Sequence, residues 1–460
     1  MTKEASRGTR AIVLDMLMEI TSGQSYSHMV IKNVLDKYNY MDAQEKAFVK
    51  RLTEGTLERQ IQLDYILNQF SKTTVTKMKP LIRNLLRMSV YQLLFMDRIP
   101  DSAVCNEAVR LAEKRKFHTL KGFVNGVLRN IARNKENIRY PDREKEPLSY
   151  LSVMYSMPEW IVKMWMADYG TETTERMLEA LLQEHPVTIR LRENLTESEK
   201  TSVLDGLKAA GAELRQHPYL PYAFVLTHAE GMNKLAPFRE GKIYVQDVSS
   251  MFVAECAGIR PGDRVLDVCA APGGKSLHAA DKLLAVGDTR GCVEARDVSE
   301  EKTELIRQNV ERLGLSNVMV RVQDAVVAEV SSEESADVLL MDVPCSGLGV
   351  IGKKRDIKYN ADPERMPELV KLQKDILRAC IPYVKKGGTI LFSTCTIHRA
   401  ENEELLQWML QEFPLSLQSL DEFLPAELHG ETTSKGYLQF LPGIHQTDGF
   451  FLAKLRRREE

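Results

Sequence analysis

The sequence predicts a multidomain chain with an all-helical domain over residues 1–140, a small α/β domain over 141–235 and a doubly wound α/β domain over 236–460. Three observations support this division. Apolar residues recur at helical spacing in the first region, and alternating apolar and polar runs appear in the second. In the third region, short apolar runs alternate with helical stretches. A length of 460 residues is enough for two or three separate cores.

The first 140 residues contain the helical domain. Apolar residues between positions 12 and 20 follow the three- and four-residue spacing of an amphipathic helix. The tripeptide Pro100-Asp101-Ser102 predicts a turn followed by the start of another helix. A polar, proline-bearing stretch over residues 140–147 predicts the linker that ends this domain.

Charge is distributed unevenly along the chain. Residues 1–140 hold 24 Lys and Arg against 14 Asp and Glu, a net charge of +10, and the rest of the chain carries −12. The runs EKRK at 113–116 and FVNGVLRN at 123–130 make the end of the helical domain basic. Two interpretations remain open, namely a contact with an anionic partner or a solvated helical surface.

The two following domains are predicted from their strands. In the middle domain we expect a helix over 197–210 and strands over 187–192, 213–215 and 223–227. In the last domain we expect strands over 264–268, 291–295, 318–322, 338–341, 389–393 and 450–455. Because these last runs are apolar without clean alternation, helices should cover both faces of their sheet. Ligands of such sheets bind at the carboxyl ends of the strands.

Several classes of protein are excluded or disfavoured. No apolar run reaches the roughly 18 residues that span a bilayer. The start of the chain, MTKEASRGTR, lacks the apolar core of a signal peptide, so we expect a cytoplasmic protein without a membrane partner. The seven cysteines include no C-x-x-C pair, and Cys395-x-x-His398 is a lone pair of possible ligands. We therefore expect neither a disulfide framework nor a metal site. We expect a monomer.

A loop with two glycines follows the strand predicted at 264–268. It reads Cys269-Ala270-Ala271-Pro272-Gly273-Gly274-Lys275, and a helix is predicted after it. Glycines allow close approach of the backbone to a ligand, and a helix N-terminus offers free N–H groups. A tight turn used only for packing would show the same pattern.

Two ligand classes fit this loop. Gly274-Lys275-Ser276 matches the end of a P-loop, and VLLMD at 338–342 resembles its assisting strand, but the first glycine of that motif is Cys269. The second class is a nucleoside cofactor whose ribose is held by an acid about 20 residues further on. Glu294 and Asp297 both satisfy that spacing.

Two cysteines follow two other predicted strands. Asp342-Val343-Pro344-Cys345 ends one strand, and Ser393-Thr394-Cys395 ends another. If both strands are parallel members of one sheet, a carboxylate and two thiols face the crevice of the cofactor loop. The competing interpretation is that both cysteines are small buried residues, which is a common position for free cysteine.

These motifs resemble a known family. CAAPGGK at 269–275, DVPCSGLGV at 342–350 and STCT at 393–396 are similar to the signature of the RsmB/Nop2-type RNA cytosine C5-methyltransferases. The similarity extends to FVNGVLRN at 123–130, YVQDVSSM at 244–251 and the segment from Leu441 to the end. The arrangement resembles the RsmB (Sun) branch, which joins a NusB-like helical RNA-binding domain, a small middle domain and a Rossmann-like methyltransferase domain.

The resemblance implies a function and a set of site residues. It implies a 16S rRNA (cytosine-C5)-methyltransferase that uses S-adenosyl-L-methionine (SAM) and forms a covalent cysteine–cytosine intermediate on small-subunit ribosomal RNA. The loop 269–275 would bind SAM, and Cys395 would be the nucleophile. Cys345 would assist breakdown of the intermediate. The acids would be Asp297 at the ribose, Asp324 near the adenine and Asp342 at the mouth of the site.

The chemistry requires these residue types. Carbon 5 of cytosine becomes nucleophilic when a thiolate adds to carbon 6, and a hydrogen-bond partner at N3 must stabilise the developing charge. Asp342, if protonated or sharing a proton with N3, would serve there, and backbone groups around Pro344 could hold the exocyclic amine. A paired base is out of reach, so the target must be unpaired or flipped out.

Two departures and two alternatives qualify this hypothesis. The sequence Gly352-Lys353-Lys354-Arg355-Asp356 lacks the proline usual in the family, and Arg192 replaces a usual asparagine, so contacts with RNA are in doubt. The alternatives are a P-loop NTPase, disfavoured by Cys269, and a NusB-like RNA-binding factor with an inert second half. Intact Cys395 and Asp342 argue against inertness.

Overall fold

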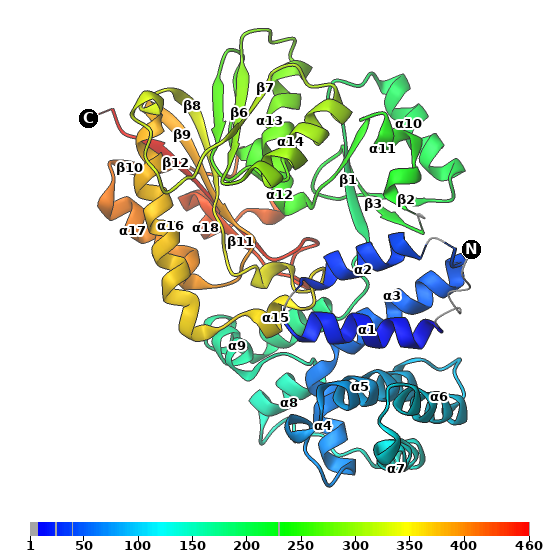
Figure 1. The fold of residues 1–460 in the computed structure, drawn as a ribbon. Coiled ribbons are helices and arrows are strands. Elements are labelled where there is room, and N and C mark those ends of the chain that lie inside the picture. Colours follow the sequence, from blue (N-terminus) through cyan, green and yellow to red (C-terminus); the bar gives the residue numbers. More distant parts are fainter. Residues whose placement is uncertain (1–7, 24, 39, 229–230, 460) are drawn as a thin grey trace. The chain divides into compact units, whose positions relative to one another are not determined.

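The computed structural model describes residues 8–459 except residues 24, 39, 229 and 230 (Figure 1). The first seven residues of the stretch that predicted no signal peptide therefore lie outside the described residues. The chain divides into two compact units. The helical unit comprises residues 1–183 and an inserted segment, residues 351–361, and the sheet unit comprises residues 184–350 and 362–460. Within the described residues, no helix is both long and apolar enough to cross a membrane.

The helical unit confirms the predicted all-helical N-terminal region. Its helices are α1 Thr9–Thr21, α2 Ser27–Lys37, α3 Ala43–Glu58, α4 Gln60–Phe70, α5 Pro80–Phe95, α6 Asp101–Lys114, α7 Lys121–Arg133, α8 Pro147–Met154, α9 Glu159–Leu181 and, in the inserted segment, α15 Ile357–Asn360. Helix α6 begins at Asp101, directly after the predicted turn. Helices α8 and α9 belong to this unit although they lie beyond residue 140, the predicted end of the helical domain.

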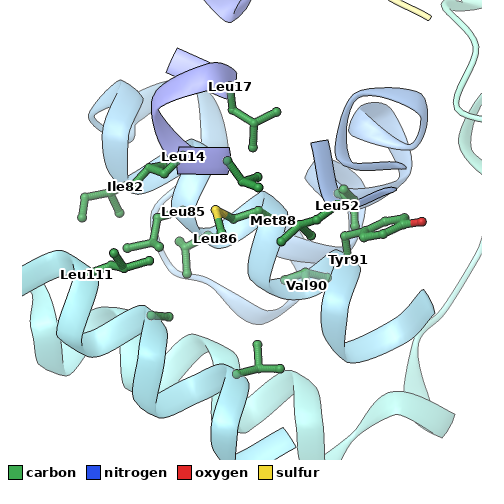
Figure 2. Packing of buried hydrophobic residues seen from close by; sticks show 14 of the residues in the cluster. Leu14, Leu17, Leu52, Ile82, Leu85, Leu86, Met88, Val90, Tyr91 and Leu111 are labelled. Atoms are coloured by element: carbon green, nitrogen blue, oxygen red, sulfur yellow. The ribbon is translucent and has the colours of Figure 1, made fainter. Parts of the chain in front are cut away.

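Helix α5 is the centre of this unit's core. Eleven of its 16 residues are buried, which is typical of a helix surrounded by others. Figure 2 shows Leu14 of α1, Leu52 of α3 and Leu111 of α6 packed around α5. The buried Arg87 of α5 is matched by Asp64, whose two carboxylate oxygens accept its Nε and Nη2 at 2.7 and 2.6 Å.

The inserted segment is held in the helical unit by polar contacts. The buried carboxylate of Asp356 accepts the backbone N–H and hydroxyl of Ser27, at 3.0 and 2.5 Å, where α2 begins. Arg355 pairs with Glu58 at 2.9 Å, and the Nζ of Lys358 donates to the Glu58 carbonyl at 2.7 Å. Burial lowers the pKa of Lys358 to about 7. Arg355 belongs to the segment where the sequence departs from the family's usual pattern, and it forms an ion pair within the protein.

A four-stranded antiparallel sheet opens the sheet unit. Its strands are β1 Val187–Leu191, β2 Glu213–Gln216, β3 Ala223–Thr227 and β4 Ile243–Val245, in the order β2-β3-β1-β4. Helices α10 Glu197–Ala209 and α11 Ala236–Arg239 contribute apolar side chains to its core. Three strands and α10 lie where the sequence predicted them. The short strand β4 was not predicted and lies beyond residue 235.

The larger sheet carries five parallel strands and an antiparallel edge. Its strands are β5 Arg264–Asp267, β6 Cys292–Asp297, β7 Val318–Val322, β8 Ala336–Asp342, β9 Val384–Thr394, β10 Leu415–Leu417, β11 Tyr437–Phe440 and β12 Phe450–Arg457. The order is β10-β12-β9-β8-β5-β6-β7, with β11 also paired to β12. Strands β9, β8, β5, β6 and β7 are parallel. Strand β12 pairs antiparallel with β9, β10 and β11.

Helices cover both faces of the larger sheet, as predicted. They are α12 Val248–Cys256, α13 Gly274–Ala285, α14 Glu300–Leu313, α16 Met366–Cys380, α17 Glu403–Glu412 and α18 Glu431–Lys435. In β5, Val265 packs in the cluster of α12 and α13, whereas its neighbour Leu266 packs in the cluster of α16 and α17. Successive strand residues therefore enter opposite layers, which explains the unbroken apolar runs.

A buried ion-pair cluster joins the smaller sheet to α13. Arg190 and Arg192 donate to the two oxygens of Asp281 at 2.9 and 2.5 Å, and all three side chains are almost fully buried. Arg192 also donates to the carbonyl of Leu313 at 2.6 Å. The arginine that replaces the family's usual asparagine is therefore a structural residue of the sheet unit.

Candidate active site

The carboxyl ends of the parallel strands bring the predicted motifs to one rim. Strand β8 pairs with β5 on one side and β9 on the other, with Leu340 opposite Asp267 and Asp342 opposite Ser393. Strand β6 follows on the far side of β5 and ends at Asp297. The glycine loop after β5, the Asp342 motif after β8 and Cys395 after β9 thus share one edge of the sheet.

The glycine loop connects β5 to the N-terminus of α13. Gly273 occupies the N-cap with φ of +107°, a conformation that L side chains rarely adopt. A Cβ at Gly273 would also lie 3.0 Å from the Leu277 side chain. Cys269, the first residue of the loop motif, is half-buried, and burial raises the pKa of its thiol well above the ordinary value. The loop is therefore a tight turn that requires glycine at position 273, and its Cys269 thiol is neutral.

Asp297 contacts the loop directly, whereas Glu294 does not face it. The Oδ2 of Asp297 accepts the backbone N–H of Ala271 at 2.9 Å, and its side chain is almost fully buried. Glu294 instead forms ion pairs with Arg264 at 2.8 Å and Arg296 at 2.7 Å. Of the two acids that sequence spacing left open, Asp297 therefore lies at the loop.

The sequence interpretation missed one acid of the loop. Asp267, the last residue of β5, is buried and accepts the hydroxyl of Ser276 at 2.5 Å. Its other oxygen faces the backbone N–H of Cys269 at 3.4 Å. Burial raises the pKa of Asp267 to about 7. Its position as the final, polar residue of an apolar strand was the signal that could have identified it.

Lys275 of the loop reaches the Asp342 motif. Its Nζ donates to Oδ2 of Asp342 at 2.6 Å, and the hydroxyl of Ser393 donates to Oδ1 at 2.9 Å. Burial of Lys275 disfavours its charge, but Asp342, Asp267 and Cys395 together outweigh burial and raise the pKa of Lys275. Asp342 is therefore the acidic half of an ion pair with Lys275.

The two cysteines of the motifs meet. The sulfurs of Cys345 and Cys395 lie 3.2 Å apart, and no disulfide joins them. The hydrogen bond with Cys395, together with burial and the carboxylates of Glu401 and Asp342, raises the pKa of Cys345 well above its ordinary value. The carboxylates of Glu401 and Asp342 act on Cys345, and the Cys395 thiol helps raise the pKa of Lys275.

Two further predicted groups have defined positions. Asp324 follows β7, is exposed, and accepts the backbone N–H of Val326 at 3.1 Å. The carbonyl of Pro344 accepts the side-chain amide of Gln373 at 2.9 Å, which leaves one of its two lone pairs for a ligand.

One group of possible metal ligands was found among the described residues, outside the motifs above. It consists of Glu193, Glu255 and His278. The ammonium of Lys282 lies 3.1 Å from the first carboxylate and 2.8 Å from the second, so a charged side chain already lies where a cation would bind. Burial lowers the pKa of His278 well below its ordinary value.

Comparisons with known proteins agree with this arrangement. Residues 257–456 match the family described as 16S rRNA methyltransferase RsmB/F, residues 7–133 match the NusB family, and residues 157–233 match the RsmF/B-like ferredoxin-like domain. The chain is 36% identical to a probable ribosomal RNA small subunit methyltransferase B of Bacillus subtilis, covering 98% of each chain. It is 32% identical to the ribosomal RNA small subunit methyltransferase B of Citrobacter koseri over the full length of both. The crystal structure of PH0851 is similar over 99% of this chain and 100% of that chain, with 25% identity and a TM-score of 0.80.

Proposed function

Because the chain belongs to the RsmB/F family of 16S rRNA methyltransferases, we propose that it methylates carbon 5 of a specific cytosine in that RNA, through a covalent bond between Cys395 and the base. The observation that carries this proposal is the pair of reduced thiols, 3.2 Å apart, at the rim that also bears the Lys275–Asp342 ion pair. A thiolate is the nucleophile such a reaction requires.

The proposed methyl donor is SAM, held by the loop 269–275 with Asp297, Asp324 and Asp342. The residues fit this molecule by charge. Asp342 pairs with Lys275 and Asp297 with Lys302, while Asp324 adds a third carboxylate, so the described residues of the rim offer no unpaired ammonium and suit a cationic sulfonium better than a polyphosphate. When bound, SAM would supply an electrophilic methyl group. This distribution of charge also disfavours the P-loop alternative.

The roles of the two cysteines differ in the proposed reaction. The sulfur of Cys395 bonds to carbon 6 of cytosine, and electron density moves toward carbon 5 and N3. After methylation, carbon 5 must lose its proton before the bond to sulfur can break, and this later step is assigned to Cys345.

Lys275 and Asp342 serve the cytosine ring in this proposal. The ammonium of Lys275 has three N–H donors, of which Asp342 takes one. A second donor is available for the ring nitrogen that gains charge when sulfur adds to carbon 6. The carboxylate of Asp342 and the remaining lone pair of the Pro344 carbonyl are acceptors for the exocyclic amine.

Binding of the RNA is proposed to involve the NusB-like region. Lys114 and Lys116 are exposed on the basic end of the helical unit, where they are available to phosphates. The target cytosine must leave its helix or lie in a loop, because a stacked and paired base cannot reach a thiol at a strand end. We place this activity in the cytoplasm, where a reducing environment keeps the thiols reduced.

The experiment that tests the proposal is denaturing gel electrophoresis with labelled SAM and 16S rRNA lacking the modification. Cys345→Ala should trap a covalent protein–RNA complex that already carries the labelled methyl group, because loss of the carbon 5 proton is blocked. Cys395→Ala should form no complex and transfer no methyl group. Bisulfite sequencing of the wild-type product should show one new protected cytosine.

Two outcomes would contradict the proposal. A complex trapped by Cys395→Ala and not by Cys345→Ala would reverse the roles of the cysteines. Methyl transfer that survives in the Cys395→Ala variant would exclude this residue as the nucleophile. Cys292→Ala is a matched control, because Cys292 is an exposed thiol at the opposite end of strand β6 from Asp297.

A further inference from the structure

A buried carboxylate that the sequence motifs did not identify lies beside the segments that carry Cys345 and Cys395. Glu401 has no solvent-exposed surface. Its Oε2 accepts the backbone N–H of Ser346 and the side-chain amide of Gln373, each at 2.9 Å. Its Oε1 accepts the hydroxyl of Ser346 at 2.5 Å and faces Nδ1 of His398 at 3.0 Å. A buried carboxylate requires such partners in place of water, and here four groups supply them.

Two of these four groups belong to Ser346, which directly follows Cys345. The N–H of Ser346 is part of the planar peptide that begins at the Cys345 carbonyl carbon, so its bond to Glu401 fixes the orientation of that peptide. The hydroxyl of Ser346 lies 2.6 Å from that of Thr396, the residue after Cys395. Glu401 therefore holds the backbone of Cys345 and is linked through Ser346 to the backbone of Cys395.

The next residue holds the other cysteine. Asn402 is also fully buried, and its Oδ1 accepts the hydroxyl of Thr394 at 2.5 Å. Its Nδ2 donates to the carbonyl of Thr396 at 3.1 Å and to the side chain of Gln439 at 2.7 Å. Thr394 and Thr396 are the two neighbours of Cys395, so Asn402 fixes the chain on both sides of that thiol.

We propose that Glu401 and Asn402 are positioning residues that hold the two sulfurs for separate steps, Glu401 acting on Cys345 and Asn402 acting on Cys395. This inference rests on the proposed function, which assigns Cys395 to bond formation and Cys345 to release of the product. Neither residue reacts. Each acts through the backbone that carries one thiol, and a displacement of about 1 Å at a reacting group can slow a step roughly 100-fold.

The test measures the two steps separately in the full-length protein. Single-turnover methyl transfer to unmodified 16S rRNA reports the step of Cys395, and the amount of methylated covalent complex on a denaturing gel reports the step of Cys345. Glu401→Ala should leave methyl transfer within a few fold of wild type but slow multiple turnover roughly 10- to 100-fold, with accumulation of the methylated complex. Asn402→Ala should slow single-turnover transfer by a similar factor and accumulate no complex.

Conservative variants and controls sharpen the result. Glu401→Gln should restore most turnover, because its amide oxygen can accept the Ser346 N–H while its NH₂ group donates to the Ser346 hydroxyl. Ser346→Ala removes only the hydroxyl link and should accumulate the complex to a smaller extent, which keeps the test decisive if Glu401→Ala unfolds. Glu404→Ala removes an exposed carboxylate from the start of α17 and should behave like wild type.

Specific outcomes would overturn the inference. Equal slowing of both steps in Glu401→Ala and Asn402→Ala would indicate a general structural role. The inference would also be rejected if Glu401→Ala and Ser346→Ala accumulated no more methylated covalent complex than Glu404→Ala. Cys345→Ala in the same gel distinguishes the two levels. If it traps no methylated complex, the proposed function fails; if it traps one and Glu401→Ala does not, only the positioning role fails.

Discussion

Asp297→Ala should weaken the binding of SAM without a large loss of stability. The Asp297 carboxylate accepts the N–H of Ala271 in the glycine loop, at 2.9 Å, and its removal leaves that donor unpaired. Water can satisfy this half-buried donor in the free protein, whereas bound SAM would cover it, and a covered donor without a partner costs about 1–3 kcal/mol. If this loss is expressed in the bound state, the dissociation constant rises roughly 5- to 150-fold.

Glu294→Gln should lower the stability of the protein and leave the binding of SAM nearly unchanged. The Glu294 side chain is buried and pairs with Arg264 and with the fully buried Arg296. Removing one partner of a buried pair costs about 3–5 kcal/mol, and the partly exposed Arg264 favours the lower end. For a unit of this size, about 3 kcal/mol corresponds to a fall of roughly 6–12 °C in the thermal midpoint. The affinity for SAM should change little.

Titration calorimetry with SAM and thermal unfolding of both variants would separate these effects. A raised dissociation constant in Glu294→Gln at an unchanged midpoint, with normal binding by Asp297→Ala, would refute the choice of acid. Tight binding and hydrolysis of ATP by the wild-type protein would instead support the P-loop alternative.

Three further changes have defined expectations. Lys114→Glu combined with Lys116→Glu should weaken RNA binding, measured over a series of salt concentrations. The slope of the logarithm of the binding constant against the logarithm of salt concentration should become shallower by about one to two, since fewer counterions are released; an unchanged slope would favour a solvated surface. Lys358 has its pKa lowered by burial, so the unfolded chain binds more protons between about pH 7 and 10.4, and stability should rise with pH across that window by up to about 1.4 kcal/mol per unit. Lys358→Met should flatten this rise in thermal unfolding at several pH values. Asp281→Ala strands two buried arginines and should lower stability by about 3–5 kcal/mol in denaturant titration, whereas equal stability would show that the pair is dispensable.

The fold class was predictable because local patterns and tertiary structure agree. Apolar periodicity identified the helical region, and unbroken apolar runs identified the parallel strands, whose two faces both pack under helices. The antiparallel position of β12 was not predictable, since a buried strand has the same composition in either direction. The three-residue strands β4 and β10 are too short to carry a periodic signal.

The candidate site was predictable only where chemistry lies within a motif. The glycine loop, Asp342 and the two cysteines lie in contiguous motifs, and parallel strand ends were enough to bring them together. The Lys275–Asp342 pair and the contacts of Glu401 join residues tens of positions apart, so no local spacing reports them. Arg192 is similar, because a sequence shows its charge but not the buried Asp281 that compensates it.

The inserted segment has a consequence for biosynthesis. The helical unit receives most of its chain by residue 183, but the contacts of Asp356 and Lys358 become available only when residue 361 has been added, about 180 residues later. At 5–20 residues per second this interval is roughly 9–36 s. During that time Ser27 at the start of α2 and Glu58 at the end of α3 lack their partners Asp356 and Lys358. A nascent chain released before residue 351 therefore lacks a piece of its first folded unit as well as its last one.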